Sequence, residues 1–564
     1  MSAVHKRSLG ESLVDEGIIT AEQLVQAKTE EKRLGIRLRK VLVRMELIEE
    51  EDLVAFLSNK LKLPRIELDN YLIDPETIDL ISEELARKYE LIPVIKVGKH
   101  ITCAMLDPWN IFALDEIRMR TNLTVEPAVA TETEIKKALD EYYGAKGSME
   151  DLVKSIDDDV MSLEKGKELD VEKLQDIGEE PVVIKIVNLI LLEAANEGAS
   201  DIHIEPEKEA LKIRIRVDGV LREISPPPKH LQGAIISRIK IMLNLDIAER
   251  RRTQDGRFTV NIKGKEIDVR VSTLPMVYGE NVVLRLLDIS SALIGLMNMG
   301  FSKDMLSIYK KLITRPHGIV LVTGPTGSGK STTLYASLNE INSVEKNIIT
   351  VEDPVEYKLE GIRQMQVNPK VDLTFANGLR SILRQDPDVI MVGEMRDGET
   401  AEIAIQAALT GHLVFSTLHT NDAPGAVTRM IDMGVEPFLV SSSIIGVLAQ
   451  RLIRTICPDC RKKYKPSKEE LADIGLDPGL DTEFYKGEGC DKCKNTGYKG
   501  RVGIYELMVP NDEIRNMMLR KASSEEIRKE ALSAGMVSLK SDGIKKVMQG
   551  VATVEEVLRV AEEE

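Results

Sequence analysis

Residues 317–341 read HGIVLVTGPTGSGKSTTLYASLNEI, in which an apolar run, a glycine-rich loop and a helix-forming segment follow one another. The loop GPTGSGKS fits the pattern G-x-x-x-x-G-K-[ST] of a phosphate-binding loop. Short patterns of this kind also occur by chance, but here strand, loop and helix come in the required order. The stretch therefore predicts a P-loop nucleotide site in an α/β domain.

This loop contains the residue types that polyphosphate binding requires. Its glycines let the backbone curl so that successive N–H groups face a phosphate, and the N-terminus of the next helix adds positive charge. Lys330 has the length to reach the β- and γ-phosphate oxygens of ATP, and the Ser331 hydroxyl is a ligand for Mg²⁺. The residues predicted to bind nucleotide are Gly324, Pro325, Thr326, Gly327, Ser328, Gly329, Lys330, Ser331 and Thr332.

Carboxylates that hold the metal and orient water are expected after neighbouring apolar strands. The segment NIITVEDPVEY supplies Glu352, Asp353 and Glu356, and DPDVIMVGEMRD supplies Glu394. In many P-loop ATPases the second of these strands ends in Asp-Glu, whereas Gly393 takes the Asp place here. Glu394 therefore serves alone or shares the metal with the Glu352 segment.

Two histidines lie at opposite ends of the apolar run LVFSTL, within TGHLVFSTLHTNDA. His412 precedes the run, and His419 follows it beside Thr417, Thr420 and Asn421. One interpretation is that both sense the γ-phosphate. The other is a structural role for each, because an isolated histidine is usually structural.

Four of the 5 cysteines form two CxxC pairs near the C-terminus. Two such hairpins bring four thiolates to one ion, and four protein ligands fit a closed, structural Zn²⁺ site. Loose thiols or a redox pair are the alternative. The predicted zinc ligands are Cys457, Cys460, Cys490 and Cys493, in an insert at about residues 455–503.

The composition describes a multidomain chain without a membrane segment. At ~150 residues per domain, 564 residues correspond to about four domains. Aromatic residues are only 4%, which favours aliphatic cores in helical and α/β layers, and no apolar stretch approaches a membrane span. Lys and Arg number 76 against 92 Asp and Glu, and the resulting charge of −16 disfavours non-specific nucleic-acid binding. We expect a cytoplasmic protein unless a partner holds it at a membrane.

Shifts in pattern predict the domain boundaries. The first 60 residues repeat their apolar spacing with a period of 29, which indicates a small module of paired helices. An acidic stretch, residues 146–180, lacks apolar periodicity and is typical of a linker. The predicted parts are a helical module at 1–63, an α/β domain at 64–145, the linker, an α/β domain at 181–295 and the P-loop domain at 296–564.

The domain at 181–295 contains a basic stretch, because eight arginines fall between Arg214 and Arg257. These residues form either an ordinary solvated face or a surface that contributes guanidinium groups to a phosphate site.

Several motifs together resemble those of the bacterial type II/type IV secretion ATPase family (GspE/PilB), in the family's own order from about residue 182 to the end. The matching segments are ASDIHIEP, IRVDGVLRE, QDGR, VSTLP, GPTGSGKSTTLY, TVEDPVEY, ILRQDPDVIMVGEMRD, TGHLVFSTLHTNDA, SSSIIGVLAQRL and CPDC…CDKC. Two modules precede this part, and the resemblance is therefore greatest to motors of type IV pilus assembly. Type II secretion motors are the close alternative.

The resemblance implies a fold and a set of roles. The fold is multidomain α/β, with a PAS-like domain before the RecA-like P-loop ATPase core. Glu352 and Asp353 fall in the family's Asp box, Glu394 is its Walker B glutamate, and His412 and His419 form its His box. Its arginines act from the domain before the P-loop domain. The candidates are Arg222, Arg238, Arg251 and Arg257.

The resemblance also implies partners and a location. The family works as cytoplasmic homohexamers, peripheral at the inner membrane. There ATP hydrolysis displaces an integral-membrane platform protein, and cytoplasmic accessory proteins take part. A nucleic-acid motor on the same core, and a regulatory scaffold that uses nucleotide only as a switch, are the alternatives from other classes. The acidic net charge and the lack of an aromatic-basic platform argue against the first of these.

The N-terminal repeat resembles a module that binds cyclic-di-GMP through paired R-L-G-x-x-L…G…Gln motifs, but it departs from that pattern. Several motif positions are replaced, and a pocket built on close backbone approach suffers when glycines are lost. We expect the fold to be retained and cyclic-di-GMP binding to be weak or absent. The replacing residues are Ser8 and Glu31 in the first copy and Arg39, Glu46 and Lys60 in the second.

Overall fold

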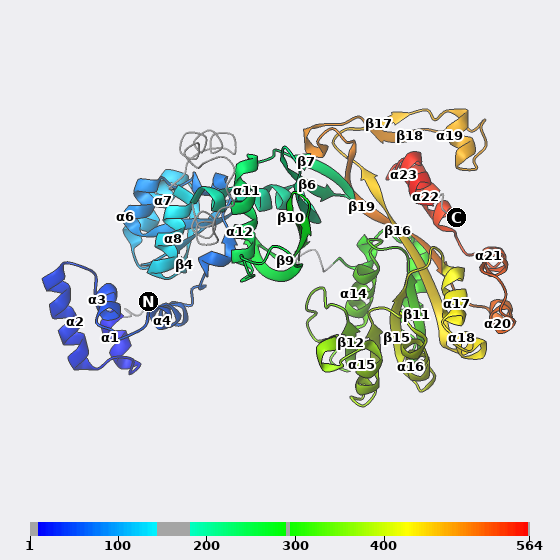
Figure 1. The fold of residues 1–564 in the computed structure, drawn as a ribbon, viewed down its shortest axis with the longest axis horizontal. Helices are drawn as coiled ribbons and strands as arrows, with labels where there is room; N and C mark the ends of the chain where they lie inside the picture. Colours follow the sequence, from blue (N-terminus) through cyan, green and yellow to red (C-terminus); the bar gives the residue numbers. More distant parts are fainter. Residues whose placement is uncertain (1–8, 144–180, 289–293, 562–564) are drawn as a thin grey trace, which may run out of the picture. The chain divides into compact units, whose positions relative to one another are not determined.

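The computed structural model describes residues 9–143, 181–288 and 294–561 (Figure 1). These residues belong to two compact units, Met1–Ile289 and Ser290–Glu564. The predicted acidic linker at 146–180 lies outside the described residues. Within the described ranges, no helix is both long and apolar enough to cross a membrane.

The first unit begins with the predicted paired helices. The second helix of the first pair starts after Thr20, whose hydroxyl accepts from the backbone N–H of Gln23 in a capping box. The apolar faces of the four helices cover one another, with Leu13, Leu42 and Leu53 buried. The helices are α1 (Leu9–Asp15), α2 (Ala21–Leu34), α3 (Leu38–Arg44) and α4 (Glu50–Leu61).

A small three-stranded sheet with its helices follows. Strand β2 is antiparallel to β3, across a turn in which Gly98 has a φ of 59°, and β3 is parallel to β4. The elements are α5 (Pro75–Ile78), α6 (Glu83–Tyr89), β2 (Leu91–Val97), β3 (His100–Met105), α7 (Ile111–Thr121), β4 (Thr124–Val129) and α8 (Glu132–Tyr143).

The last part of the first unit is a seven-stranded sheet in the order β1-β8-β9-β10-β5-β6-β7. Alternate residues of β6 are buried, and α11 and α12 contribute apolar side chains to the same core. The edge strand β1 (Tyr71–Leu72) pairs parallel to β8 through Leu72 and Ile262, a pairing that the sequence does not predict. The other elements are α11 (Pro181–Asn196), β5 (Asp201–Pro206), β6 (Leu211–Val217), β7 (Val220–Ile224), α12 (Gln232–Met242), β8 (Gln254–Ile262), β9 (Lys265–Met276) and β10 (Gly279–Asp288).

The second unit is built on another seven-stranded sheet, in the order β13-β12-β14-β15-β11-β16-β19, of which only β19 is antiparallel to its neighbour. Because the other strands are parallel, the loops after β11, β12, β14 and β15 all leave from one edge. The strands are β11 (Gly318–Thr323), β12 (Ile348–Glu352), β13 (Arg363–Gln366), β14 (Val389–Val392), β15 (Leu413–Leu418), β16 (Ile444–Ile456) and β19 (Tyr498–Met508).

Helices cover both faces of this sheet, which explains why its central strands are apolar without alternation. In β11, Ile319 and Leu321 join the core formed with α15, α16, α17 and α18, whereas Val320 and Val322 join the core formed with α13 and α14. The helices are α13 (Lys303–Ile313), α14 (Lys330–Ile341), α15 (Phe375–Ile382), α16 (Gly398–Leu409), α17 (Ala423–Asp432) and α18 (Pro437–Ser443).

A smaller element connects the end of β16 to the start of β19 and carries the CxxC pairs (Figure 1). It consists of β17 (Arg461–Tyr464), α19 (Lys468–Asp473) and β18 (Phe484–Gly487), and β17 and β18 form an antiparallel ladder. The chain ends with α20 (Asp512–Leu519), α21 (Ser524–Ser533), α22 (Leu539–Met548) and α23 (Val554–Ala561).

Candidate nucleotide site and metal centre

The glycine-rich loop connects β11 to α14, as predicted. Gly324, Gly327 and Gly329 have φ angles of 149°, 81° and 89°, a region that residues with a Cβ rarely adopt. A Cβ on Gly324 would lie 2.5 Å from the carbonyl oxygen of Gln450. Glycine is therefore required at this position by backbone angle and by space.

Lys330, the first residue of α14, lies over the loop. Its ammonium donates to the carbonyl oxygens of Gly324 at 2.8 Å and Pro325 at 3.2 Å. Burial lowers the pKa of Lys330 to about 8; Glu394 opposes this shift and Arg451 adds to it. The predicted binding residues differ in exposure, because Pro325, Thr326, Gly327 and Ser331 are exposed whereas Ser328 is buried.

Glu394 follows β14 at the same edge of the sheet. His419 Nε2 lies 3.2 Å from one of its carboxylate oxygens, and Arg396 forms an ion pair with the other. A Cβ at the preceding Gly393 would make ordinary van der Waals contact, 3.4 Å from the Cα of Glu352.

The Asp-box residues point to different surroundings. Glu352 is buried, accepts from Thr350 at 2.6 Å and Gln364 at 3.1 Å, and is also hydrogen-bonded by the Tyr335 hydroxyl. Burial raises the pKa of Glu352 despite these hydrogen bonds. Asp353, in contrast, is exposed and lies 3.8 Å from Arg396. Of the two, Asp353 is the carboxylate that shares a partner with Glu394.

The two histidines lie at opposite ends of strand β15. His419 follows β15 on the P-loop side and reaches Glu394. His412 precedes β15, and its backbone carbonyl accepts from Gly318 at the start of β11, about 20 Å from the loop at ~3.3 Å per residue. Its ring lies 2.8 Å from the carbonyl oxygen of Ala407. The structure therefore brings His419, and not His412, to the nucleotide site of the same unit.

The four candidate arginines belong to the first unit. Arg222 lies on β7, Arg238 on α12, Arg257 on β8 and Arg251 in the loop between α12 and β8. The side chain of Arg251 is 92% exposed.

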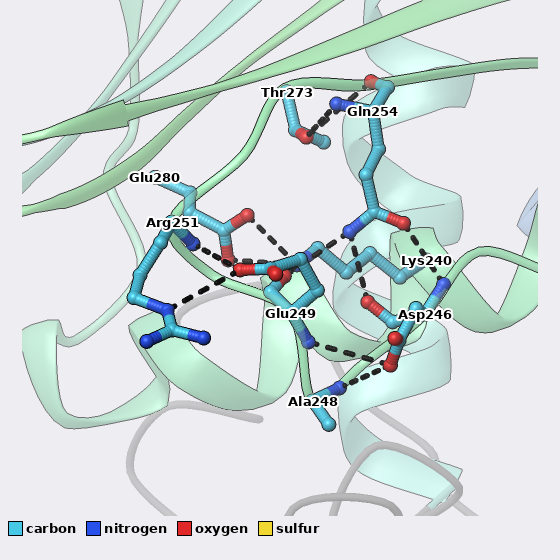
Figure 2. A network of polar contacts seen from close by, with 8 residues as sticks. All are labelled: Lys240, Asp246, Ala248, Glu249, Arg251, Gln254, Thr273 and Glu280. Carbon is cyan, nitrogen blue, oxygen red and sulfur yellow. Dashed lines mark hydrogen bonds and ion pairs between the residues drawn. The ribbon is translucent and has the colours of Figure 1, made fainter.

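A buried network holds the backbone of this arginine loop (Figure 2). Lys240, with a side chain only 1% exposed, lies 2.7 Å from a carboxylate oxygen of Glu280 and donates to the Glu249 carbonyl at 2.7 Å. Gln254 donates to the same carbonyl at 3.1 Å, and the Glu249 carboxylate accepts from the backbone N–H of Arg251 at 2.7 Å. The loop backbone is thus held by contacts within the domain, while the exposed Arg251 side chain has its Nε 3.7 Å from a Glu249 carboxylate oxygen (Figure 2).

The four predicted cysteine ligands come together, with their sulfur atoms all within 4.8 Å of one another. Three of the sulfur–sulfur distances are 3.9, 3.8 and 3.7 Å. A tetrahedral ion with metal–sulfur bonds of about 2.3 Å requires about 3.8 Å between sulfurs, so the cluster fits one metal ion. Backbone N–H groups of Cys490 and Gly497 also donate to the Cys493 sulfur.

Comparison with known proteins identifies the chain. Residues 176–559 match the family described as "Type II/IV secretion system protein". The chain belongs to this family of secretion ATPases. It is an ATPase, and the P-loop, Glu394 and His419 lie within the matched region.

Two relatives match the secretion ATPase over nearly its whole length. The "Type IV pilus assembly ATPase PilB" of Myxococcus xanthus is 46% identical, over 98% of each chain. The "Type II secretion system protein E" of Xanthomonas campestris pv. campestris is 43% identical, also over 98% of each chain. Among solved structures, the ATPase DotB of Legionella pneumophila has the same fold, with a TM-score of 0.51 and 22% identity over 68% of this chain and 96% of that chain.

A second family match lies in the N-terminal part of this secretion ATPase. Residues 61–149 match the "MshEN domain". The match covers the three-stranded α/β part, whereas the predicted likeness to a cyclic-di-GMP module rests on the helical repeat before it.

Four residues at the ATPase site are not among those predicted from the sequence. Tyr335 bonds to Glu352, Arg396 lies between Glu394 and Asp353, and Gln450 and Arg451 lie beneath the P-loop. Arg396 stands two residues after Glu394 in the segment GEMRD, so its nearness in sequence is a local signal. Tyr335 of α14 contacts Glu352 of β12, and Gln450 and Arg451 of β16 contact the P-loop. Each of these contacts joins two separate elements, so no local pattern in the sequence indicates it.

Proposed function

We propose that the chain is a hexameric, ATP-hydrolysing motor of type IV pilus assembly that acts on an inner-membrane platform protein. The observation that carries this proposal is the match to the Myxococcus xanthus PilB, which extends over 98% of both chains. It includes the modules before the ATPase region as well as that region. Assembly of a type II secretion pseudopilus is the second candidate, supported by the full-length match to the Xanthomonas protein.

The site supports a division of labour in hydrolysis. The P-loop N–H groups, the N-terminus of α14 and Lys330 bind the phosphates of ATP. Glu394 orients the attacking water and accepts its proton, while His419 and Arg396 hold the carboxylate in place. Ser331 and either Asp353 or Glu394 would hold Mg²⁺, which would supply charge neutralisation at the phosphates.

We propose that the arginines of the first unit complete the site during domain closure. A guanidinium brought to the γ-phosphate by domain closure would couple hydrolysis to movement. Arg251 is supported by its exposed side chain, on a loop whose backbone is hydrogen-bonded to Glu249. Arg222, Arg238 and Arg257 stay predictions, as do the predicted domain boundaries and any role for His412.

The tetracysteine cluster supports a structural Zn²⁺. Thiolates are soft ligands that favour ions such as Zn²⁺, and four of them leave no open position for substrate. The ion would fix the connection between β16 and β19, because Cys457 immediately follows β16.

We propose a cytoplasmic protein that is peripheral at the inner membrane through its partners, and we expect no nucleic-acid partner.

Weak or absent cyclic-di-GMP binding is supported by Arg39, which replaces a motif glycine. Its side chain is buried, which lowers its pKa, with Asp107 and Glu132 as its main charged neighbours. Nanomolar cyclic-di-GMP binding to the full chain in calorimetry would contradict this.

A deletion strain tests the two candidate functions against each other. Loss of surface pili with normal enzyme secretion supports the pilus assembly motor, and the reverse supports type II secretion. With the purified chain, stimulation of ATP hydrolysis by DNA but not by the platform protein would favour a nucleic-acid motor instead.

A further inference from the structure

Gln450 lies directly beneath the phosphate-binding loop. It follows Ala449, which pairs with Thr323 at the end of β11, so that Gln450 stands level with Gly324. Gln450 is only 1% exposed. A polar side chain at such a place is stable only when its donor and acceptor groups are both satisfied.

Both ends of the Gln450 carboxamide bind the nucleotide-binding segment. Nε2 donates to the carbonyl oxygen of Ser328 at 2.7 Å, and Oε1 accepts from the hydroxyl of Thr333 at 2.7 Å. Ser328 precedes Lys330 by two residues, and Thr333 follows it by three. One side chain from a separate strand thus connects the two sides of the P-loop lysine.

The loop packs tightly on this strand. A Cβ on Gly324 would lie 2.5 Å from the Gln450 carbonyl oxygen, and a Cβ on Gly329 would lie 3.2 Å from Nε2. Because Gly324 and Gly329 have no side chains, β16 can pack against one side of the loop, and the other side keeps room for phosphate. The curvature of the loop depends on β16 as well as on its own sequence.

We propose that Gln450 is a positioning residue for nucleotide binding. It holds the Ser328 carbonyl away from the phosphate side and fixes the first turn of α14, so that the loop N–H groups and Lys330 are oriented before ATP arrives. Preorganisation of this kind raises affinity because binding then orders fewer groups. The role belongs to the ATPase core and is independent of the pilus and secretion alternatives.

Nucleotide affinity of the full chain tests the proposal. Gln450→Ala is expected to weaken the binding of a Mg²⁺–non-hydrolysable ATP analogue, and to raise KM, by about tenfold. We expect kcat at saturating ATP to change less than KM. The matched control is Thr455→Val, which removes a hydrogen bond from the same strand to the carbonyl of Lys499 without touching the loop. Unchanged affinity in Gln450→Ala, or an equal loss in Thr455→Val, would overturn the proposal.

The Gln450–Thr333 hydrogen bond can also be removed by changing Thr333, so the proposal can be tested even if Gln450→Ala does not fold. Thr333→Val removes the hydroxyl and is expected to weaken analogue binding. Thr333→Ser keeps the hydroxyl and is expected to bind the analogue nearly as well as the unmodified chain. When Gln450→Ala folds, the double variant is expected to bind no more weakly than the weaker single variant, because both disrupt one connection. A full additive loss, or equal affinities of the Ser and Val variants, would contradict the assigned role.

Discussion

His419 Nε2 lies 3.2 Å from the carboxylate of Glu394, although 25 residues separate the two in the chain. Adjacent parallel strands, β14 and β15, bring them to the same edge of the sheet. Arg396 pairs with the other carboxylate oxygen, so Glu394 is held from two directions. The carboxylate is thereby oriented without help from Glu352, which is enclosed by its own hydrogen bonds.

The first prediction concerns the Glu394 carboxylate. Glu394→Gln preserves shape and hydrogen bonding but removes the base, so we expect ATP binding to be retained and kcat to fall by about 100-fold or more. Equilibrium binding and steady-state hydrolysis measure the two effects separately. Glu399→Gln, at an exposed carboxylate on α16, is the control. Undiminished hydrolysis in Glu394→Gln would remove the assigned role.

The second prediction follows from the lowered pKa of Lys330. The folded, nucleotide-free chain releases this proton near pH 8, below the ordinary lysine value of 10.5, and the phosphates of ATP favour its return. Nucleotide binding should therefore take up a proton between these values, and affinity should fall as pH rises through about 8.

Calorimetry in buffers of different ionisation enthalpy, at about pH 9, measures this uptake directly. Lys330→Ala should bind nucleotide more weakly and lose this component of the uptake. If the unmodified chain shows no proton uptake at that pH, the lysine is not neutral before binding.

The third prediction is one zinc ion per chain by elemental analysis of fresh, unchelated protein. Cys457→Ser should lose the metal and destabilise the C-terminal half more than it alters nucleotide affinity, because the cluster lies beyond the end of β16. Cys103→Ala, at a buried thiol of the first unit, should keep the full metal content. Less than about a tenth of an equivalent in the unmodified protein would refute the zinc site.

The fourth prediction concerns the buried Lys240–Glu280 pair. Lys240→Met leaves the Glu280 carboxylate buried without its cation, which should lower the free energy of unfolding of the first unit by about 3 to 5 kcal/mol. The double change Lys240→Met with Glu280→Leu should cost less. Chemical denaturation measures both, and Lys310→Met, at a half-exposed ion pair, should cost about 1 kcal/mol or less. If the double variant were less stable than Lys240→Met, the unpaired Glu280 carboxylate would not be the cause of the destabilisation.

Features encoded in short local patterns could be predicted from the sequence. The P-loop and the CxxC pairs carry their key residues within a few positions, and the structure places both as expected. Strands such as β6 follow from strict alternation, and the left-handed Asp218-Gly219 turn after it follows from its residue types. In these cases the determining contacts are local in the chain.

The remaining features depend on contacts distant in sequence. Gln450 lies 117 residues from Thr333, and the pattern LAQRL does not indicate what it touches. His412 and His419 have similar surroundings in the sequence, but the direction of β15 places only His419 beside Glu394. The acidic stretch of Glu352 and Asp353 likewise does not indicate which carboxylate faces the core, because that depends on Tyr335 of another element.

Strand β1 changes how truncations of this protein should be interpreted. It comes from the N-terminal part of the chain, yet it forms the outer edge of the sheet in the domain that follows. A shortened protein that starts near residue 176 would leave the backbone groups of β8 unpaired along this edge. Exposed edges of this kind promote self-association. Aggregation or lost activity in such a protein would therefore report a broken sheet edge, even where no partner-binding surface had been removed.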